Sequence, residues 1–509
     1  MIVNTEVIDW TKNGKPILDS YGRCRRLLCV SYVNKEKKID KFIWAIPENF
    51  MYQWKYAGKN DTPDTYFQSW DFKPVVKEQI LGDFSEQRIH EILIDLEKMY
   101  PDDPKISQFN ELYIPETTFA DIEVFVDKNG FPKASAAKND INTISFVKGD
   151  DAACIGLAKL SESDIQWIQE QIDEHCKSFD TKYKFRYTYH ETEQSLINDA
   201  FVNYIGPAEC ITGWNWFGYD WPYLFNFAKN INYDISWLSP TKTTFKYAPM
   251  MAKGKEDYVQ IPTHKCMYDY LEIYKKWDQS VSPKITNKLD WVAETVLGVK
   301  KVSHSLGFEE MWKQQKKEYV FYNVIDSILV REIDKKIKTA SIFFGLASLM
   351  HTPALTAFSS TKSIEIVQAE YLYKENKIFP KVKKDKKSHD EYEGAFVFEP
   401  KPALYQYVMT ADYASLYPTT CRQFNISPDT FMFKDKNYVP KDDEIKTVSG
   451  AVYTGKFKGF IPKILDDFYA KRKSFKKKMV AAQEDSYELE KILKARLGNG
   501  VYEEDDEDE

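Results

Sequence analysis

The sequence contains few cysteines for its length, and they form no cluster. Among its 509 residues are seven cysteines, and no two of them stand in a C-x-x-C pair. This pattern excludes a cysteine-based zinc site and a disulfide framework. We therefore expect reduced, mostly buried thiols in a cytosolic protein.

Long apolar runs are also missing. No run approaches the roughly 18 apolar residues that a membrane-spanning helix needs. Residues 1–12 lack the basic-then-apolar layout of a signal peptide. We expect neither a membrane span nor a leader, and a location in the cytoplasm. With 43% apolar and 15% aromatic residues the chain can bury large cores, and its length suggests about three domains.

A strong positive charge, which would indicate a nucleic-acid partner, is absent as well. The net charge is −7, and the last seven residues, 503–509, are all acidic, so the remainder of the chain is balanced. Residues 471–478 carry six positive charges in eight positions. An acidic metal site and basic DNA-binding surfaces can occur in one protein, so the net charge alone decides little.

The first 115 residues contain no group that indicates chemistry. Short β-prone runs cover 26–33 and 41–46, and a helix is predicted over 86–100, ended by Pro101-Asp102-Asp103-Pro104. We expect a scaffolding domain here.

Two acids follow on a predicted strand over residues 119–126. Because side chains alternate along a strand, Asp121 and Glu123 point to one side and Ile122 and Val124 to the other. Adjacent carboxylates repel each other unless a cation lies between them. The alternative is an edge strand with a polar, solvent-facing side.

Another acid follows a short buried strand, Cys210 to Asn215. A helix is predicted over 216–227, with Asp220 in its first turns, where a carboxylate is favoured. The alternative is an acid that stabilises only the start of the helix. Farther on, residues 264–271 read as one more strand, and Asp269 reads as a structural acid, not as a further metal ligand.

A tyrosine and an acid share one face of a helix predicted over 309–338. Tyr322 and Asp326 are four residues apart, which places both side chains on the same face. An ordinary polar pair on a helix surface is the alternative interpretation.

Taken in order, these three strings resemble the Exo I, Exo II and Exo III motifs of DnaQ-like 3′→5′ exonucleases, as carried by family B DNA polymerases. The resemblance implies that Asp121, Glu123, Asp220 and Asp326 hold two Mg²⁺ or Mn²⁺ ions, and that Tyr322 orients the attacking water. Oxygen donors suit these ions, and a pair of metals about 3.5–4 Å apart stabilises the attacking and leaving oxygens of a phosphodiester. It further implies an RNase H-like sheet flanked by helices.

A longer string, Ala-Asp-Tyr-Ala-Ser-Leu-Tyr-Pro over 411–418, follows a β-prone run over 405–410. It resembles motif A of family B DNA polymerases, and residues 422–428 resemble the T4-type phage branch. The resemblance implies that Asp412 is one of two palm aspartates that bind metal. It also implies a set of nucleotide contacts: the Tyr413 carbonyl as a lesser metal ligand, Ser415 and Leu416 along the triphosphate, and Tyr417 under the sugar, where its ring excludes a 2′-hydroxyl.

The last part of the sequence favours two helices, over 464–484 and 487–497, with Gly498-Asn499-Gly500 as a stop. Arg472 and Lys476 share a face of the first helix and can clamp a triphosphate. This resembles the first fingers helix of the T4-type polymerases; a solvated basic face is the alternative. Upstream, Tyr392-Glu393-Gly394-Ala395 resembles the element that joins the exonuclease to the polymerase in this family.

Two strings of the family are missing from these 509 residues. Neither the K-x-x-x-N-S-x-Y-G string of the fingers nor the Y-G-D-T-D string with the second palm aspartate is present. We expect one incomplete polymerase metal site, and dNTP addition only with a complementing C-terminal polypeptide. A split gene is preferred, and a fragment of a longer protein is the alternative. In the split case exposed apolar palm surface binds the partner, and the acidic tail covers the basic helix until partner or DNA arrives.

The sequence thus predicts the N-terminal part of a DNA-directed DNA polymerase with a complete proofreading exonuclease. Its predicted partners are primer-template DNA and dNTP. Its predicted location is the cytoplasm, which is that of the host cell if the source is a phage. The rivals are a non-catalytic replisome scaffold and a stand-alone repair exonuclease. The predicted fold class is multidomain, α/β and α+β. The predicted domains are an N-terminal domain (1–115 with 341–382), an exonuclease domain (116–340), a partial palm (383–462), partial fingers (463–502) and an acidic tail (503–509).

Overall fold

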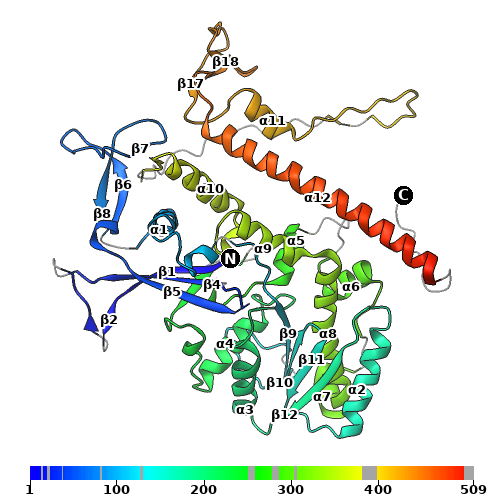
Figure 1. Cartoon of the computed structure of the whole chain (residues 1–509). Helices are drawn as coiled ribbons and strands as arrows, with labels where there is room; N and C mark the ends of the chain where they lie inside the picture. Colours follow the sequence, from blue (N-terminus) through cyan, green and yellow to red (C-terminus); the bar gives the residue numbers. More distant parts are fainter. Residues whose placement is uncertain are drawn as a thin grey trace. The chain divides into compact units, whose positions relative to one another are not determined.

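The computed structural model describes most of the chain (Figure 1). The described residues are 1–12, 15–19, 23–36, 38–80, 83–109, 111–126, 130–249, 258–277, 286–302, 306–380, 398–399 and 401–497. The chain divides into two compact units, residues 1–51 with 81–367, and residues 52–80 with 368–509. The predicted junction string 392–395 and the acidic tail lie outside the described residues.

The first unit begins with a small antiparallel sheet and one helix. The strands β1 (Ile2–Asp9), β4 (Arg26–Val33) and β5 (Ile39–Ala45) pair in the order β1-β4-β5, and β2 (Thr11–Lys12) pairs with β3 (Lys15–Pro16). Helix α1 (Glu86–Met99) starts at Ser85, whose hydroxyl accepts the Arg88 N–H. Strand β4 and helix α1 agree with the prediction, and β5 begins two residues early.

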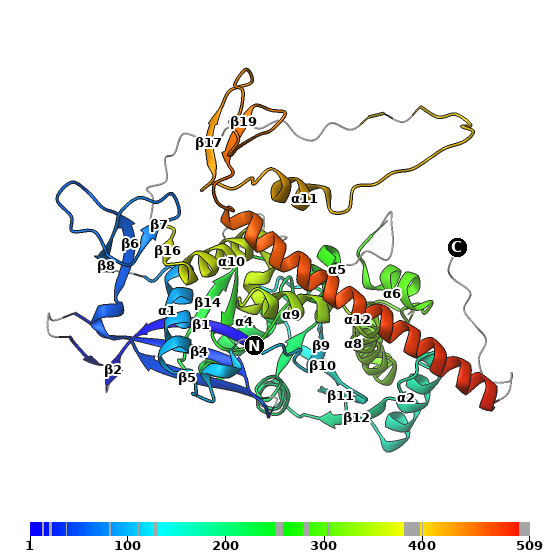
Figure 2. The same cartoon turned by 45° about the horizontal axis from the view of Figure 1, so that its top comes forward.

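The main sheet of the first unit has five strands in the order β12-β11-β10-β9-β13. The antiparallel neighbours are β9 with β10 and β10 with β11, whereas β12 and β13 run parallel to their neighbours. Figure 2 shows β9, β10, β11 and β12 of this sheet. The bounds of the strands are β9 (Thr117–Val124), β10 (Ile141–Lys148), β11 (Asp151–Gly156), β12 (Lys184–Tyr189) and β13 (Cys210–Thr212). Each face of this sheet has its own apolar core, so the sheet lies between two helical layers.

One layer contains α2 (Glu162–His175), α6 (Leu289–Leu297), α8 (Lys316–Ile337) and α9 (Thr339–Leu349), and its core includes Phe119 of β9. The other contains α3 (Glu193–Asp199), the π-helical turn Ala200–Ile205 and α4 (Asp220–Asn230), and packs on Ile122 of β9. The unit also contains α5 (Tyr270–Trp277), α7 (Phe308–Gln314) and the hairpin of β14 (Thr244–Tyr247) and β15 (Val259–Pro262).

Several sequence predictions for this unit need correction. The strand predicted from Cys210 to Asn215 ends at Thr212, because turns begin at Trp214. Residues 264–271 do not form a strand: only Met267 makes a parallel bridge, to Ile211, and α5 starts at Tyr270. The predicted helix 309–338 is two helices that meet at Gln315, where the backbone is not helical. The helix predicted from Trp216 starts at Asp220, because the preceding residues form turns.

The second unit combines small sheets with long helices. Its strands are β6 (Tyr52–Tyr56), β7 (Gln68–Ser69), β8 (Val75–Gln79), β16 (Lys377–Ile378), β17 (Phe431–Lys434), β18 (Glu444–Lys446) and β19 (Ala451–Thr454). Its helices are α11 (Leu416–Gln423) and α12 (Phe460–Leu497), and α10 (Ser360–Lys374) spans the division between the units.

Two predictions for the second unit are wrong. Residues 405–410 form no strand and are exposed, since no other strand of the described chain pairs with them and an unpaired strand leaves its backbone groups unsatisfied. The helices expected over 464–484 and 487–497 are one continuous helix, α12, because Asp485 and Ser486 do not break it. None of the helices in the described chain is long and apolar enough to cross a membrane.

Candidate metal-binding acidic site

The first two acids of the site lie on β9, between β10 and β13 in the main sheet. Ala120, Ile122 and Val124 point into the core under α3 and α4. The alternation of the strand therefore directs Asp121 and Glu123 to the opposite face, where α8 lies. A strand with apolar residues on one side and two acids on the other is what the sequence predicted.

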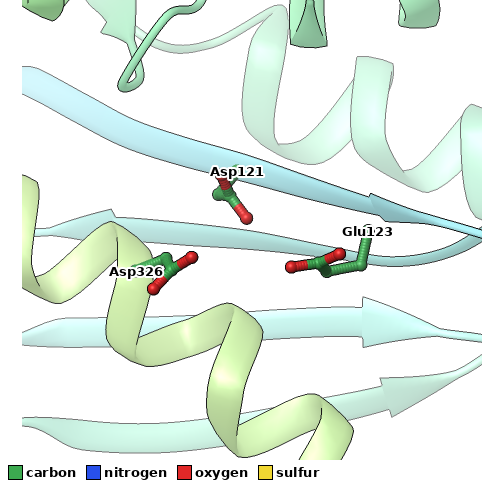
Figure 3. Close-up of side chains that lie close together, drawn as sticks. All are labelled: Asp121, Glu123 and Asp326. Carbon is green, nitrogen blue, oxygen red and sulfur yellow. The ribbon is translucent and has the colours of Figure 1, made fainter. Parts of the chain in front are cut away.

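The third acid comes from α8, which crosses this face of the sheet. Asp326 lies opposite β9, and one carboxylate oxygen from each of Asp121, Glu123 and Asp326 lies within 4.8 Å of the others. Figure 3 shows the three side chains pointing toward one another between strand and helix. Glu123 and Asp326 are buried, with 7% and 5% of their surface exposed. The arrangement can chelate a cation with oxygen donors.

Burial and mutual repulsion shape the electrostatics of this cluster. Burial is the main cause that raises the pKa of Asp121, and the negative charge of Asp326 raises it further. Burial likewise raises the pKa of Glu123 well above its ordinary value, and Asp121 adds to the rise. Three carboxylates that disfavour one another's ionisation are stabilised when a positive charge enters.

A lysine that the sequence analysis missed supplies one such charge. The Nζ of Lys301 lies 2.5 Å from Oδ2 of Asp326, and 4.4 Å above the centre of the Tyr322 ring. The lysine side chain is 23% exposed. Burial favours its neutral form, but the charge of Asp326 prevails, so the pKa of Lys301 lies above its ordinary value. Lys301 follows α6 in a segment without regular structure, and its sequence context carries no signal.

An asparagine of α8 holds one of the acids in place. The Nδ2 of Asn323 donates to Oδ2 of Asp121 at 2.7 Å, and also lies 3.3 Å from the Asp121 carbonyl. The backbone carbonyl of Asn323 accepts a 2.9 Å hydrogen bond from the hydroxyl of Ser145, which is the cross-strand neighbour of Asp121. Asn323 stands beside Tyr322 in the third string, which is the signal that could have revealed it.

Asp220, the fourth predicted ligand, is buried at the start of α4. Its Oδ1 accepts the backbone N–H of Ile122 at 3.2 Å. Strand β13 pairs only with Thr117–Phe119 of β9, so Ile122 lies beyond that pairing. Burial and the charge of Asp121 raise the pKa of Asp220 well above its ordinary value. Asp220 thus lies next to the cluster but is not one of the three acids whose oxygens converge.

Asp269, which the sequence analysis assigned to structure, has both oxygens engaged by backbone. Oδ2 accepts the N–H of Phe217 and Oδ1 accepts the N–H of Leu271, both at 2.9 Å. The interpretation as a structural acid agrees with these contacts.

Tyr322 lies one helical turn before Asp326 and is buried. Its ring packs against Phe308, and the ammonium of Lys301 lies over its face. Burial is the main cause that raises its pKa, so the hydroxyl stays protonated and can donate a hydrogen bond.

The predicted polymerase residues lie in the second unit. Asp412 is exposed in a segment without regular structure, and in the described part of the chain it belongs to no group of three potential ligands. Tyr413, Leu416 and Tyr417 are exposed as well. Ser415 precedes α11 with a left-handed backbone, φ 54°.

Two of the predicted nucleotide contacts come together. The guanidinium of Arg472, on α12, donates to Oγ of Ser415 across 3.4 Å. Lys476 is exposed one turn farther along the same helix. The motif A string and the basic helix thus meet at Ser415.

Comparisons with known proteins define the class. The family model described as the exonuclease domain of DNA polymerase family B matches residues 83–287, and the model described as DNA polymerase family B matches residues 353–496. Together these matches cover well over half of the chain. The chain belongs to DNA polymerase family B.

The relatives it resembles include phage and eukaryotic enzymes. It is 28% identical to a DNA-directed DNA polymerase of Escherichia phage RB69 over 444 residues, covering 80% of this chain and 47% of that protein. It is 29% identical over 320 residues to that of Enterobacteria phage T4, covering 59% of this chain and 35% of that protein. A DNA polymerase delta catalytic subunit of Candida albicans is 25% identical over 308 residues, covering 56% of this chain and 29% of the relative. The chain spans about half the length of the RB69 relative and less of the other two.

Proposed function

We propose that this chain removes nucleotides from the 3′ end of DNA, and that this is the proofreading activity of a replicative polymerase. The convergence of Asp121, Glu123 and Asp326 in a buried cluster carries the proposal. Membership of DNA polymerase family B supports it, since one matching family model describes an exonuclease domain that includes Asp121, Glu123 and Asp220.

The donor set fits divalent Mg²⁺ or Mn²⁺. Carboxylate oxygens are the ligands that these ions prefer, and a divalent charge offsets the repulsion that raises the pKa values of Asp121 and Glu123. We propose that Asp121, Glu123, Asp220 and Asp326 hold two ions. When bound, such ions activate water and stabilise the leaving 3′-oxygen.

The remaining groups orient the attacking water and the Asp121 carboxylate, and they balance the charge of the site. We propose that the protonated hydroxyl of Tyr322 donates to the attacking water or to a phosphate oxygen. Lys301 brings a positive charge to the same place and offsets the negative charge of the phosphodiester as it enters the acidic site. Asn323 fixes the carboxylate of Asp121.

The second unit is proposed to be part of a polymerase site. Asp412 is the proposed metal-binding palm aspartate, Tyr413, Leu416 and Tyr417 are proposed nucleotide contacts, and the pair of Ser415 and Arg472 with Lys476 is proposed to hold the triphosphate. Because these 509 residues contain no D-T-D string, nucleotide addition needs a polypeptide segment that supplies the second aspartate. The exposed apolar side chains over 404–417 are the proposed contact for that segment.

The proposed architecture retains the sequence-based boundaries. Residues 1–115 with 341–382 form an N-terminal domain, 116–340 an RNase H-like exonuclease domain, 383–462 a partial palm and 463–502 partial fingers. A sheet with helices on both faces in the first unit supports the exonuclease assignment.

Incubation of the purified chain with a 5′-labelled single-stranded DNA tests the proposed exonuclease activity. We expect products shortened from the 3′ end with Mg²⁺ or Mn²⁺, and none with EDTA. Asp121→Ala with Glu123→Ala is expected to abolish them, whereas Glu170→Ala with Asp173→Ala, which removes the same charge from the exposed side of α2, leaves them unchanged. Full activity in the first double variant would refute the assignment.

A further inference from the structure

Lys301 reaches the acidic cluster from a segment that has no helix or strand of its own. Helix α6 ends at Gly298, whose φ of 72° turns the chain out of the helix. Residues 299–302 then run toward α8 without regular hydrogen bonds, and the valines 299 and 302 pack only at the edge of the core. A long, flexible side chain on such a segment needs other contacts to hold its ammonium at one place.

One contact binds the N–H of the peptide unit that joins residues 300 and 301. The backbone N–H of Lys301 donates to Oδ1 of Asp290 at 3.2 Å. Asp290 lies in the first turn of α6 and is exposed. The start of α6 thus holds the chain that leaves its other end.

A second residue lies beside the same segment. The imidazole of His175, the last residue of α2, lines one cavity together with Lys300 and Lys301. The His175 ring also packs edge-on against Phe321, 6.2 Å between ring centres. Phe321 precedes Tyr322 on α8, so the ring is fixed against the helix that carries the site.

We propose that His175 and Asp290 are positioning residues for Lys301: Asp290 holds the peptide N–H that precedes its side chain, and His175 packs beside the segment against Phe321 of α8. The inference rests on the proposed exonuclease function for its catalytic meaning, but the placement of Lys301 can be tested apart from activity. The three elements that meet here also line one cavity of about 400 Å³, whose walls include His175, Lys300, Lys301 and Phe321. Loss of either contact lets the segment move and takes the ammonium away from Asp326.

Acylation footprinting tests the placement directly. The intact chain is treated with an amine-reactive anhydride, and the modification of each lysine is followed by mass spectrometry. In the unchanged protein Lys301 is expected to react slowly, because its ammonium is paired with Asp326. In Asp290→Ala and in His175→Ala it is expected to react several-fold faster, whereas the exposed Lys300 next to it reacts at the same rate in all variants.

Two conservative variants and one control separate positioning from general damage. Asp290→Asn keeps an acceptor oxygen, and His175→Phe keeps an aromatic ring against Phe321, so both are expected to protect Lys301 as the unchanged protein does. Glu294→Ala removes the exposed partner of the Lys300 ammonium, 3.1 Å away, and is expected to leave the reactivity of Lys301 unchanged. Equal Lys301 reactivity in Asp290→Ala, His175→Ala and the unchanged protein would overturn the inference, whether or not the chain degrades DNA.

The activity assay then tests the catalytic meaning. A displaced reacting group lowers kcat by about tenfold to a hundredfold, so each alanine variant should lose kcat with little change in KM. In a Lys301→Ala background the same substitutions should cost nothing more, because they act through that lysine. A further loss of kcat in the Lys301→Ala background would contradict the inference. An inactive unchanged protein with a changed footprint would instead reject the exonuclease and leave the positioning role standing.

Discussion

The ammonium of Lys301 lies 2.5 Å from a carboxylate oxygen of Asp326, which is one of the three acids of the cluster. Asp326 is therefore shared between two cations, since it is also a proposed ligand of a divalent ion. The ion pair reduces the repulsion among the three carboxylates, but it competes with metal for one of them. We therefore expect Lys301 to weaken metal binding and to promote the proposed reaction, in which it offsets the charge of the phosphodiester.

Substitution of Lys301 by alanine separates these effects. We expect Lys301→Ala to bind Mn²⁺ more tightly, because Asp326 loses its competing partner. We also expect kcat for DNA degradation to fall by about a hundredfold, the usual cost of removing one charge-stabilising donor. Calorimetric Mn²⁺ titration and single-turnover kinetics measure the two quantities. The neighbouring Lys300→Ala is the control, and equal metal affinity in both variants would contradict the shared role of Asp326.

The amide of Asn323 is expected to tune metal affinity. Asn323→Ala removes the donor that orients Asp121, and loss of such an outer contact lowers metal affinity by about tenfold or more. Ser327→Ala, one turn farther along α8 and bonded to Ser145, is the matched control and should leave the affinity unchanged. If the two variants bind Mn²⁺ equally well, Asn323 does not serve the site.

The acidic cluster should make the metal-free protein less stable as pH rises. The pKa of Asp121 is raised from 3.8 to about 8, mainly by burial, so between these values the folded chain binds more protons than the unfolded chain. The free energy of unfolding therefore falls with increasing pH across this window. Asp121→Asn removes the titrating group and should flatten the dependence.

Thermal unfolding in EDTA, followed from about pH 5 to about pH 8, measures this effect. Mg²⁺ favours the ionised carboxylates and should raise Tm most at the upper end of the range. Asp140, an exposed acid outside the cluster, provides the control Asp140→Asn. A Tm that rises with pH in EDTA would contradict a raised pKa of Asp121 in the folded chain.

Much of the acidic site could be predicted from the sequence because its parts are local. The alternation of acids and apolar residues in β9 fixes which way Asp121 and Glu123 point. The four-residue spacing of Tyr322 and Asp326 fixes a common helix face. Lys301 could not be predicted in this way, since its approach to Asp326 depends on how α6, α2 and α8 pack.

The errors have the same origin. The β-prone residues 405–410 have local strand propensity, but a strand forms only against a partner, and the described chain offers none. Residues 264–271 make a single bridge at Met267 because α5 starts immediately afterwards. In α12 the expected break at 485–486 is absent, since no residue there forces the chain out of a helix.

The basic face of α12 is expected to bind triphosphate in the second unit. Arg472→Ala and Lys476→Ala should each weaken binding of a fluorescent dNTP analogue to the chain, because each removes a cation from the helix face that contacts Ser415 through Arg472. Lys491→Ala, exposed farther along the same helix, should have no effect. Equal weakening by all three variants would indicate a merely solvated basic surface.

The most direct test of the account is the number of metal ions that the four acids bind. Calorimetric titration of the purified chain with Mn²⁺ should give two ions per chain. The double substitution Asp121→Ala with Glu123→Ala should abolish both this binding and the degradation of single-stranded DNA from its 3′ end. Titrations that show no bound ion, or the same ions and the same degradation in the double variant, would contradict it.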